Sequence, residues 1–149
     1  MNMATIFGIM AVALPLFESA FAQTKHEVAD EMRIGFIVNG KVIMATIKDS
    51  EAARDFISLL PLTLTFEDYA GTEKISYLPR KLSTKRAPSG SDPSVGDIAY
   101  YSPWGNLAIF YRDFEYSRGL VILGKLDGGI EALSVPGKVK ARIELLTEE

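Results

Sequence analysis

The sequence predicts a mainly β protein in which eight short strands close into a barrel, accompanied by one or two short helices. Three observations lead to this fold class. Eight runs of apolar or alternating residues are typical of strands, and most of the connections between them are short enough for hairpins, which implies an antiparallel sheet. Only one segment has firm helical periodicity. Closure into a barrel follows because it removes the exposed edges that an open sheet would leave.

The first two strands are expected at residues 32–38 and 42–47, on either side of Asn39-Gly40. Asn-Gly is the strongest short signal for a hairpin, because a type I′ turn needs positive φ at both central positions. A helix follows. Asp49 is expected to cap it, and Pro61 is expected to end it. Its apolar face is formed by residues spaced at i, i+3, i+4 and i+7, namely Ala53, Phe56, Ile57 and Leu60.

The remaining strands are expected at residues 62–67, 74–78, 97–101, 107–112, 120–126 and 139–145. The first and last of these alternate apolar and polar residues, as half-buried strands do. The 79–95 segment is rich in Ser, Pro, Gly and Lys. It is either a functional loop, as loops of that length often are, or a solvated insertion. A turn at 127–129 is expected to lead into one helical turn reaching Leu133.

The N-terminus has the pattern of an export signal. Residues 5–17 form an apolar run too short to span a bilayer, and Ser19-Ala20-Phe21-Ala22 is an A-x-A cleavage pattern. We expect a signal peptide at 1–22, a polar lead-in at 23–32 and the folded domain at 33–149. The protein would then be periplasmic or secreted, with no membrane contact after cleavage. A membrane-anchored N-terminus is the alternative.

Charge and composition exclude several function classes. The net charge of −3 comes without a Lys/Arg stripe, so we expect no nucleic-acid partner. Cysteine is absent, and the one histidine, His26, lies in the polar lead-in. The sequence therefore lacks the residues for a disulfide, for a Cys/His metal centre and for a His-dependent nucleophile. We expect neither a metal nor a cofactor.

The candidate binding residues gather around the only tryptophan. A bulky, polar-tipped turn on a rigid scaffold suits ligand binding. Tyr100 and Tyr101 must face opposite sides of the sheet, as must Phe110 and Tyr111, so one of each pair belongs to the core. The candidates for ligand binding are Tyr69, Arg80, Tyr101, Trp104, Asn106, Phe110 and Arg112.

A second cluster, Glu67, Asp68 and Glu73, lies near a turn. These carboxylates could serve as an acid–base pair or a Ca²⁺ patch. Alternatively they are solvated, with Lys74 close enough to neutralise one of them.

Several runs together resemble the bacterial cyclophilin-like domain proteins of the cyclophilin-like superfamily. They are LLPL (59–62), DYAGTEK (68–74), LPRKL (78–82), GDIAYY (96–101) and PWGN (103–106), followed by Phe110-Tyr111 and Leu123-Gly124. The resemblance covers roughly residue 33 to the end. It implies a closed eight-stranded barrel with helices covering its ends, in agreement with the strand count.

The resemblance does not imply the catalytic activity of cyclophilins proper. Those enzymes isomerise prolyl bonds with an Arg beside an aromatic pocket, and the Arg follows a Tyr-x-Gly-Ser/Thr turn. In the matching register, Ser76 takes the place of that Arg, and a hydroxyl cannot supply the planar fork of a guanidinium. We therefore expect a non-catalytic domain that binds a peptide or a small molecule. The alternatives are a prolyl isomerase that uses Arg80 or Arg112, and an interaction module for another exported protein.

Overall fold

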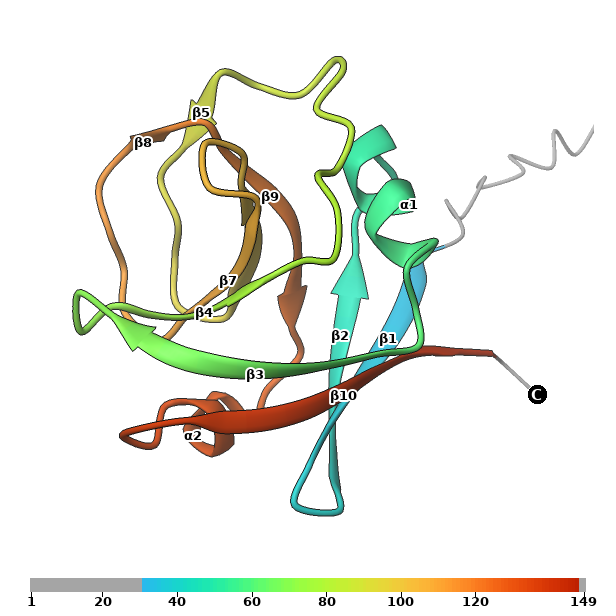
Figure 1. The fold of residues 1–149 in the computed structure, drawn as a ribbon, viewed down its shortest axis with the longest axis vertical. Coiled ribbons are helices and arrows are strands. Elements are labelled where there is room, and N and C mark those ends of the chain that lie inside the picture. The colour runs from blue at the N-terminus through green and yellow to red at the C-terminus, as the bar shows by residue number, and fades with distance from the viewer. Residues whose placement is uncertain (1–30, 148–149) are drawn as a thin grey trace, which may run out of the picture.

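The structure, a computed structural model, describes residues 31–147. Within this range eight strands form a closed antiparallel barrel in the order β1-β10-β3-β4-β7-β6-β9-β2 (Figure 1). The predicted fold class is confirmed. The barrel strands are β1 (Met32–Val38), β2 (Lys41–Ile47), β3 (Leu62–Tyr69), β4 (Glu73–Tyr77), β6 (Asp97–Tyr101), β7 (Asn106–Phe110), β9 (Leu120–Leu126) and β10 (Val139–Leu146). The predicted signal peptide, and the lead-in up to residue 30, lie outside the described residues.

Local signals explain the first hairpin. Asn39 and Gly40 have φ of 49° and 77°, the positive values that the type I′ turn requires. The turn sets the register in which Val38 pairs with Lys41 and Met32 pairs with Ile47. The Asn-Gly prediction is therefore confirmed.

Among residues 31–147, two short helices accompany the barrel, α1 (Glu51–Ile57) and α2 (Ile130–Leu133). The expectation that Asp49 caps α1 was wrong. Ser50 is the cap, because it has the extended backbone of a cap and its Oγ accepts a hydrogen bond of 3.2 Å from the Ala53 amide. Asp49 instead pairs with Arg54. The helix ends before Leu60 and Pro61, although Ala53 and Phe56 are buried as expected.

The 79–95 segment is anchored to the barrel at several points, although many of its residues are exposed. Its short strand β5 (Gly90–Ser91) pairs with β8 (Ser117–Arg118), and the two form a small sheet outside the barrel (Figure 1). Leu82 is buried, and its amide donates a hydrogen bond of 3.1 Å to the Tyr100 hydroxyl. The amide of Ser83 donates to Asp55 of α1 at 2.7 Å.

Apolar residues line both sides of one part of the barrel wall. Along β7, Leu107 and Ile109 belong to the interior cluster, whereas Ala108 and Phe110 belong to a second cluster on the outer face. All five residues of β7 are buried, which explains why this strand lacks the alternation of a half-exposed strand. The outer cluster also includes Ala99 and Leu120, with Ile75, Tyr101 and Ile122 packed against it. This outer apolar face forms the floor of the candidate functional site.

Candidate functional site

A pocket of about 260 Å³ lies on the outer wall of the barrel, over the outer apolar cluster. Its walls come from the turn between β3 and β4, from the turn between β6 and β7, and from the segment that leads through β8 to β9. We call it the aromatic pocket. Its lining consists of Tyr69, Ala70, Thr72, Glu73, Tyr101, Trp104, Asn106, Phe110, Phe114, Ser117 and Leu120.

Trp104 stands between two tyrosines at one side of this pocket. Its ring centroid lies 5.1 Å from that of Tyr69 and 5.3 Å from that of Tyr101, and both contacts are edge-to-face, with interplanar angles of 89° and 76°. Such pairs hold the rings in defined positions. The Trp104 side chain nevertheless remains 42% exposed. It therefore lines the pocket with a large apolar surface that water still reaches.

Glu73 is the one charged residue on this wall within the described part of the chain. Its side chain lies on the outer face of β4, opposite Phe110. Burial raises the pKa of the Glu73 carboxyl above its ordinary value, and a hydrogen bond from the Thr72 hydroxyl opposes part of that increase. Among residues 31–147, Glu73 forms no ion pair. The carboxylate is thus partly desolvated, with a hydroxyl as its only protein partner in that range.

Lys74 does not neutralise Glu73, because adjacent residues of a strand face opposite sides of a sheet. The Lys74 side chain is fully buried, and its Nζ pairs with Asp68 Oδ1 at 2.9 Å. It also donates hydrogen bonds to the carbonyl oxygens of Val135, at 2.7 Å, and Gly137. The ammonium therefore fastens the loop before β10 to the barrel.

Asn106 supplies a second acceptor at the pocket wall. The residue is 1% exposed, and its Nδ2 donates a long hydrogen bond of 3.4 Å to the Leu107 carbonyl oxygen. Its Oδ1 is buried without a hydrogen-bond partner in the described part of the chain. Buried polar atoms normally have a hydrogen-bond partner, so an unpaired acceptor in a residue that lines a pocket calls for an explanation, and a ligand would be one.

Five of the seven predicted binding residues meet in the aromatic pocket: Tyr69, Tyr101, Trp104, Asn106 and Phe110. The other two lie elsewhere. Arg80 binds Asp55 of α1 through two bonds of 2.8 and 3.0 Å, and this pairing lowers the pKa of the Asp55 carboxyl. Arg112 is exposed and does not line the pocket; its backbone amide donates to the Thr72 carbonyl oxygen at 3.2 Å.

Ser76 does not face the aromatic pocket either. It lies opposite Leu107 of the interior cluster and is buried on the inner side of the wall. The residues that β4 presents on the outer side are Glu73, Ile75 and Tyr77. None of them is an arginine, so β4 supplies no guanidinium to this pocket.

The three carboxylates that are close in sequence have different partners in the structure. Glu67 pairs with Lys138 at 3.2 Å, Asp68 binds Lys74 and Tyr111, and Glu73 turns to the aromatic pocket. No group of three His, Cys, Asp or Glu side chains that could hold a metal ion occurs between residues 31 and 147.

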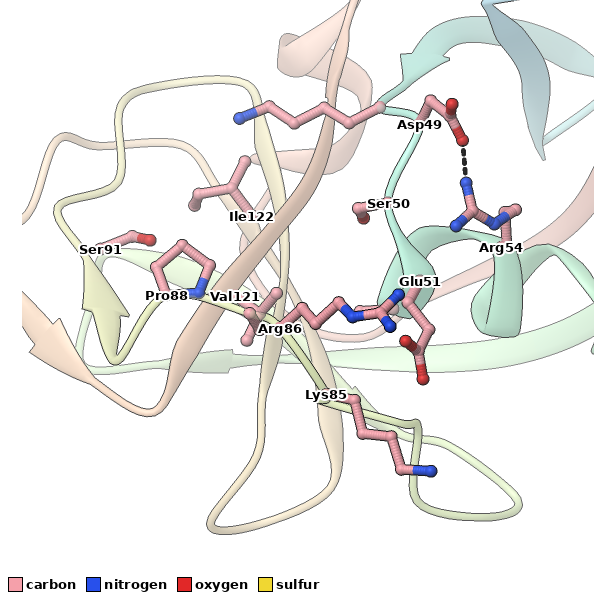
Figure 2. A pocket seen from close by; sticks show the side chains of 13 residues that line it. Asp49, Ser50, Glu51, Arg54, Lys85, Arg86, Pro88, Ser91, Val121 and Ile122 are labelled. Atoms are coloured by element: carbon pink, nitrogen blue, oxygen red, sulfur yellow. Dashed lines mark hydrogen bonds and ion pairs between the residues drawn. The ribbon is translucent and has the colours of Figure 1, made fainter.

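A larger pocket of about 400 Å³ lies between the start of α1 and the 85–91 segment (Figure 2). Its charged groups have protein partners or reach toward solvent. Asp49 and Arg54 pair with each other, and Glu51 accepts a hydrogen bond of 2.6 Å from Ser83. Figure 2 shows the Arg86 side chain extending from the loop toward α1. Within residues 31–147, this pocket has neither an aromatic lining nor an unpaired buried acceptor, so the aromatic pocket is the better candidate.

Comparison with known proteins identifies the fold family. The family model described as "Cyclophilin-like family" matches residues 36–144, well over half of the chain. The chain belongs to the cyclophilin-like family. This cyclophilin-like protein is also similar to the solution structure of a hypothetical protein from Archaeoglobus fulgidus, with a TM-score of 0.61 and 16% identity. The match covers 78% of this chain and 95% of the other, and at that identity it shows the fold alone. No curated protein matches the cyclophilin-like protein.

Sequence reasoning missed part of this site. Phe114 and Ser117 reach the pocket of the cyclophilin-like protein from a segment without periodicity, where no local pattern marks them. The sequence indicates Glu73 only as one member of a carboxylate cluster. Its placement opposite Phe110 depends on the pairing of β4 with β7, which the sequence does not specify.

Within the described residues, no helix is both long enough and apolar enough to cross a bilayer.

Proposed function

We propose that this protein is an exported, non-catalytic binding domain that takes a peptide or a small molecule in the aromatic pocket. The observation that carries the proposal is the orphan Oδ1 of Asn106 beside five aromatic side chains. Ligand sites are concave and mostly apolar, with a few polar groups that fix orientation. Glu73 and Asn106 supply those polar groups here.

The size of the pocket supports a small ligand, or one side chain of a peptide. Its volume of about 260 Å³ falls just below the roughly 300–1,000 Å³ of sites for drug-sized ligands. A concave pocket also supports this function over an interaction module for another exported protein, for which a flat aromatic patch would be the natural surface.

Prolyl isomerisation is the competing function, because the aromatic pocket could receive a proline ring. It would need a cation beside that ring. Arg80 is held by Asp55, and neither Arg80 nor Arg112 lines the pocket. The geometry therefore favours binding without catalysis.

A direct test combines an isomerisation assay with a binding assay. The purified protein should not accelerate cis–trans exchange of a prolyl peptide. It should bind members of a fragment or peptide library, and Trp104→Ala should weaken that binding. Tyr77→Ala is the matched control, since Tyr77 is 62% exposed on the outer face of β4 but does not line the pocket. Turnover by the native protein, or equal effects of the two variants, would contradict the proposal.

Export is supported by the A-x-A pattern that ends at Ala22. We infer a periplasmic or secreted protein that begins at Gln23. Mass spectrometry of the protein recovered from the cell envelope or the medium would check this. Recovery of the chain with residues 1–22 intact would contradict it.

A further inference from the structure

The charge at the aromatic pocket is negative, and this bears on the chemistry of the ligand. Among residues 31–147, Glu73 carries the only charge on the wall, and no Lys, Arg or His of that range lines the pocket. The wall also includes Asn106, whose buried Oδ1 lacks a donor in residues 31–147. An anionic ligand would meet repulsion from Glu73 and would find no cation to bind it.

The aromatic residues add to the same preference. The faces of Trp and Tyr rings carry negative charge density that attracts cations, and desolvation strengthens this attraction. Trp104, Tyr69 and Tyr101 are held together by edge-to-face contacts at the side of the pocket. Phe110 and Leu120, both buried, supply an apolar floor suited to methylene groups.

The partly buried carboxylate is itself a sign of a missing partner. Burial of Glu73 disfavours its charged form, and a hydroxyl from Thr72 compensates only part of that cost. A cation that entered the pocket would form a charge-assisted bond with the carboxylate, the stronger class of hydrogen bond.

Resting on the proposed binding function, we propose that the ligand of the aromatic pocket carries a cationic nitrogen, a primary ammonium or guanidinium, on a slender alkyl stem. The ammonium or guanidinium binds Glu73, and the stem lies among the aromatic rings. A free alkylamine and a Lys or Arg side chain of a peptide share this chemistry.

The test measures binding of matched probes to the purified protein. The cationic probes are n-butylammonium and N-acetyl-lysine N-methylamide. Their neutral counterparts are n-butanol and N-acetyl-norleucine N-methylamide, and butyrate is the anionic control. Trp104 is the only tryptophan of the chain, so a ligand that covers its exposed ring should shift the intrinsic fluorescence. Calorimetry measures the affinity independently of the Trp104 fluorescence.

Two variants test whether Glu73 supplies the negative charge that binds the cationic ligand. Glu73→Gln keeps the shape of the side chain and the hydrogen bond from Thr72 but removes the charge. We expect it to lower the affinity for the cationic probes about tenfold. Glu67→Gln is the matched control, because Glu67 pairs with Lys138 and does not line the pocket. We expect it to leave all affinities unchanged. A thermal melt of each variant verifies that it is folded.

The outcomes separate this inference from the proposed function. Equal binding of cationic and neutral probes, or unchanged binding by Glu73→Gln, would overturn the inference and leave the binding function standing. Absence of binding by every probe and by the peptide library would overturn both. If the inference holds, tighter binding of the lysine amide than of n-butylammonium would identify a peptide as the source, and equal binding would identify a free amine.

Discussion

Replacing Lys74 by methionine should destabilise the barrel more than the removal of any surface charge. The variant keeps an unbranched stem of similar length and removes only the ammonium. Three bonds are lost, to Asp68 Oδ1 at 2.9 Å, to the Val135 carbonyl oxygen at 2.7 Å, and to the carbonyl oxygen of Gly137.

The expected size of the effect lies between two limits. Breaking a buried ion pair costs about 3–5 kcal/mol, whereas an exposed pair contributes about 0–1 kcal/mol. The Lys74 ammonium is buried, but Val135 and Gly137 are exposed and the Asp68 carboxylate is partly so, which lets water replace some of the lost bonds. We therefore expect a loss of about 2–4 kcal/mol in the free energy of unfolding, or roughly 10 °C in Tm.

The effect should depend on pH in a defined direction. The bond from the Lys74 ammonium, together with the Gly137 amide, holds the pKa of the Asp68 carboxyl below its ordinary 3.8. A lowered pKa in the folded state contributes stability above the ordinary value, and that stability is lost as pH falls through the folded value. The difference between Lys74→Met and the native protein should thus be largest at neutral pH and should shrink below pH 3.8.

Urea denaturation at several pH values would measure this. Lys125→Met is the control, because Lys125 pairs with Asp97 at 3.2 Å while its own side chain is 55% exposed. It should cost less than about 1 kcal/mol. If Lys74→Met were no more destabilising than Lys125→Met, the reasoning about the buried ammonium would be refuted.

Three further predictions concern the pocket and the close contacts of the barrel. Burial raises the pKa of Glu73, so ionisation of this carboxyl lowers the stability of the fold as the pH rises above 4.5. In thermal melts, Glu73→Gln should therefore be more stable than the native protein by a few tenths of a kcal/mol at pH 7 and equally stable at pH 4. A Cβ on Gly124 would lie 2.3 Å from a backbone oxygen of β2, so Gly124→Ala should cost about 1–3 kcal/mol in urea titrations. Gly128→Ala, with open space around its Cβ, should be nearly neutral. A Cβ on Gly90 would lie 2.4 Å from the Ser117 carbonyl oxygen, so Gly90→Ala should weaken ligand binding by displacing the pocket wall. Unchanged affinity in calorimetry would contradict that last expectation.

The sequence was sufficient to predict the barrel, because its evidence is local. Alternation in β3 and β10, the Asn-Gly turn and the residues 120–126 of β9 each follow from neighbouring side chains. The cap of α1 was not decidable in this way, since Asp49 and Ser50 are both good caps. The structure selects Ser50, while Asp49 pairs with Arg54.

The candidate site was predicted only in part, for a different reason. Tyr101 and Trp104 are close in sequence, so their proximity could be expected. The position of Arg80 depends on where α1 packs against the segment after β4, since Asp55 of that helix binds its guanidinium. Likewise, Lys74 and Glu73 are neighbours in sequence but face opposite sides of β4. Contacts of this kind depend on tertiary pairing, which no single stretch of sequence encodes.

The two-sided wall has a consequence for how such a protein can diversify. Along β7, Leu107 and Ile109 serve the interior, and the intervening Ala108 and Phe110 serve the outer cluster beneath the pocket. Selection for a new ligand can therefore act on alternate positions of one strand while the others keep the barrel folded. A library that randomises only the outward positions would explore recognition without disturbing the interior, and relatives with different ligands could share one barrel.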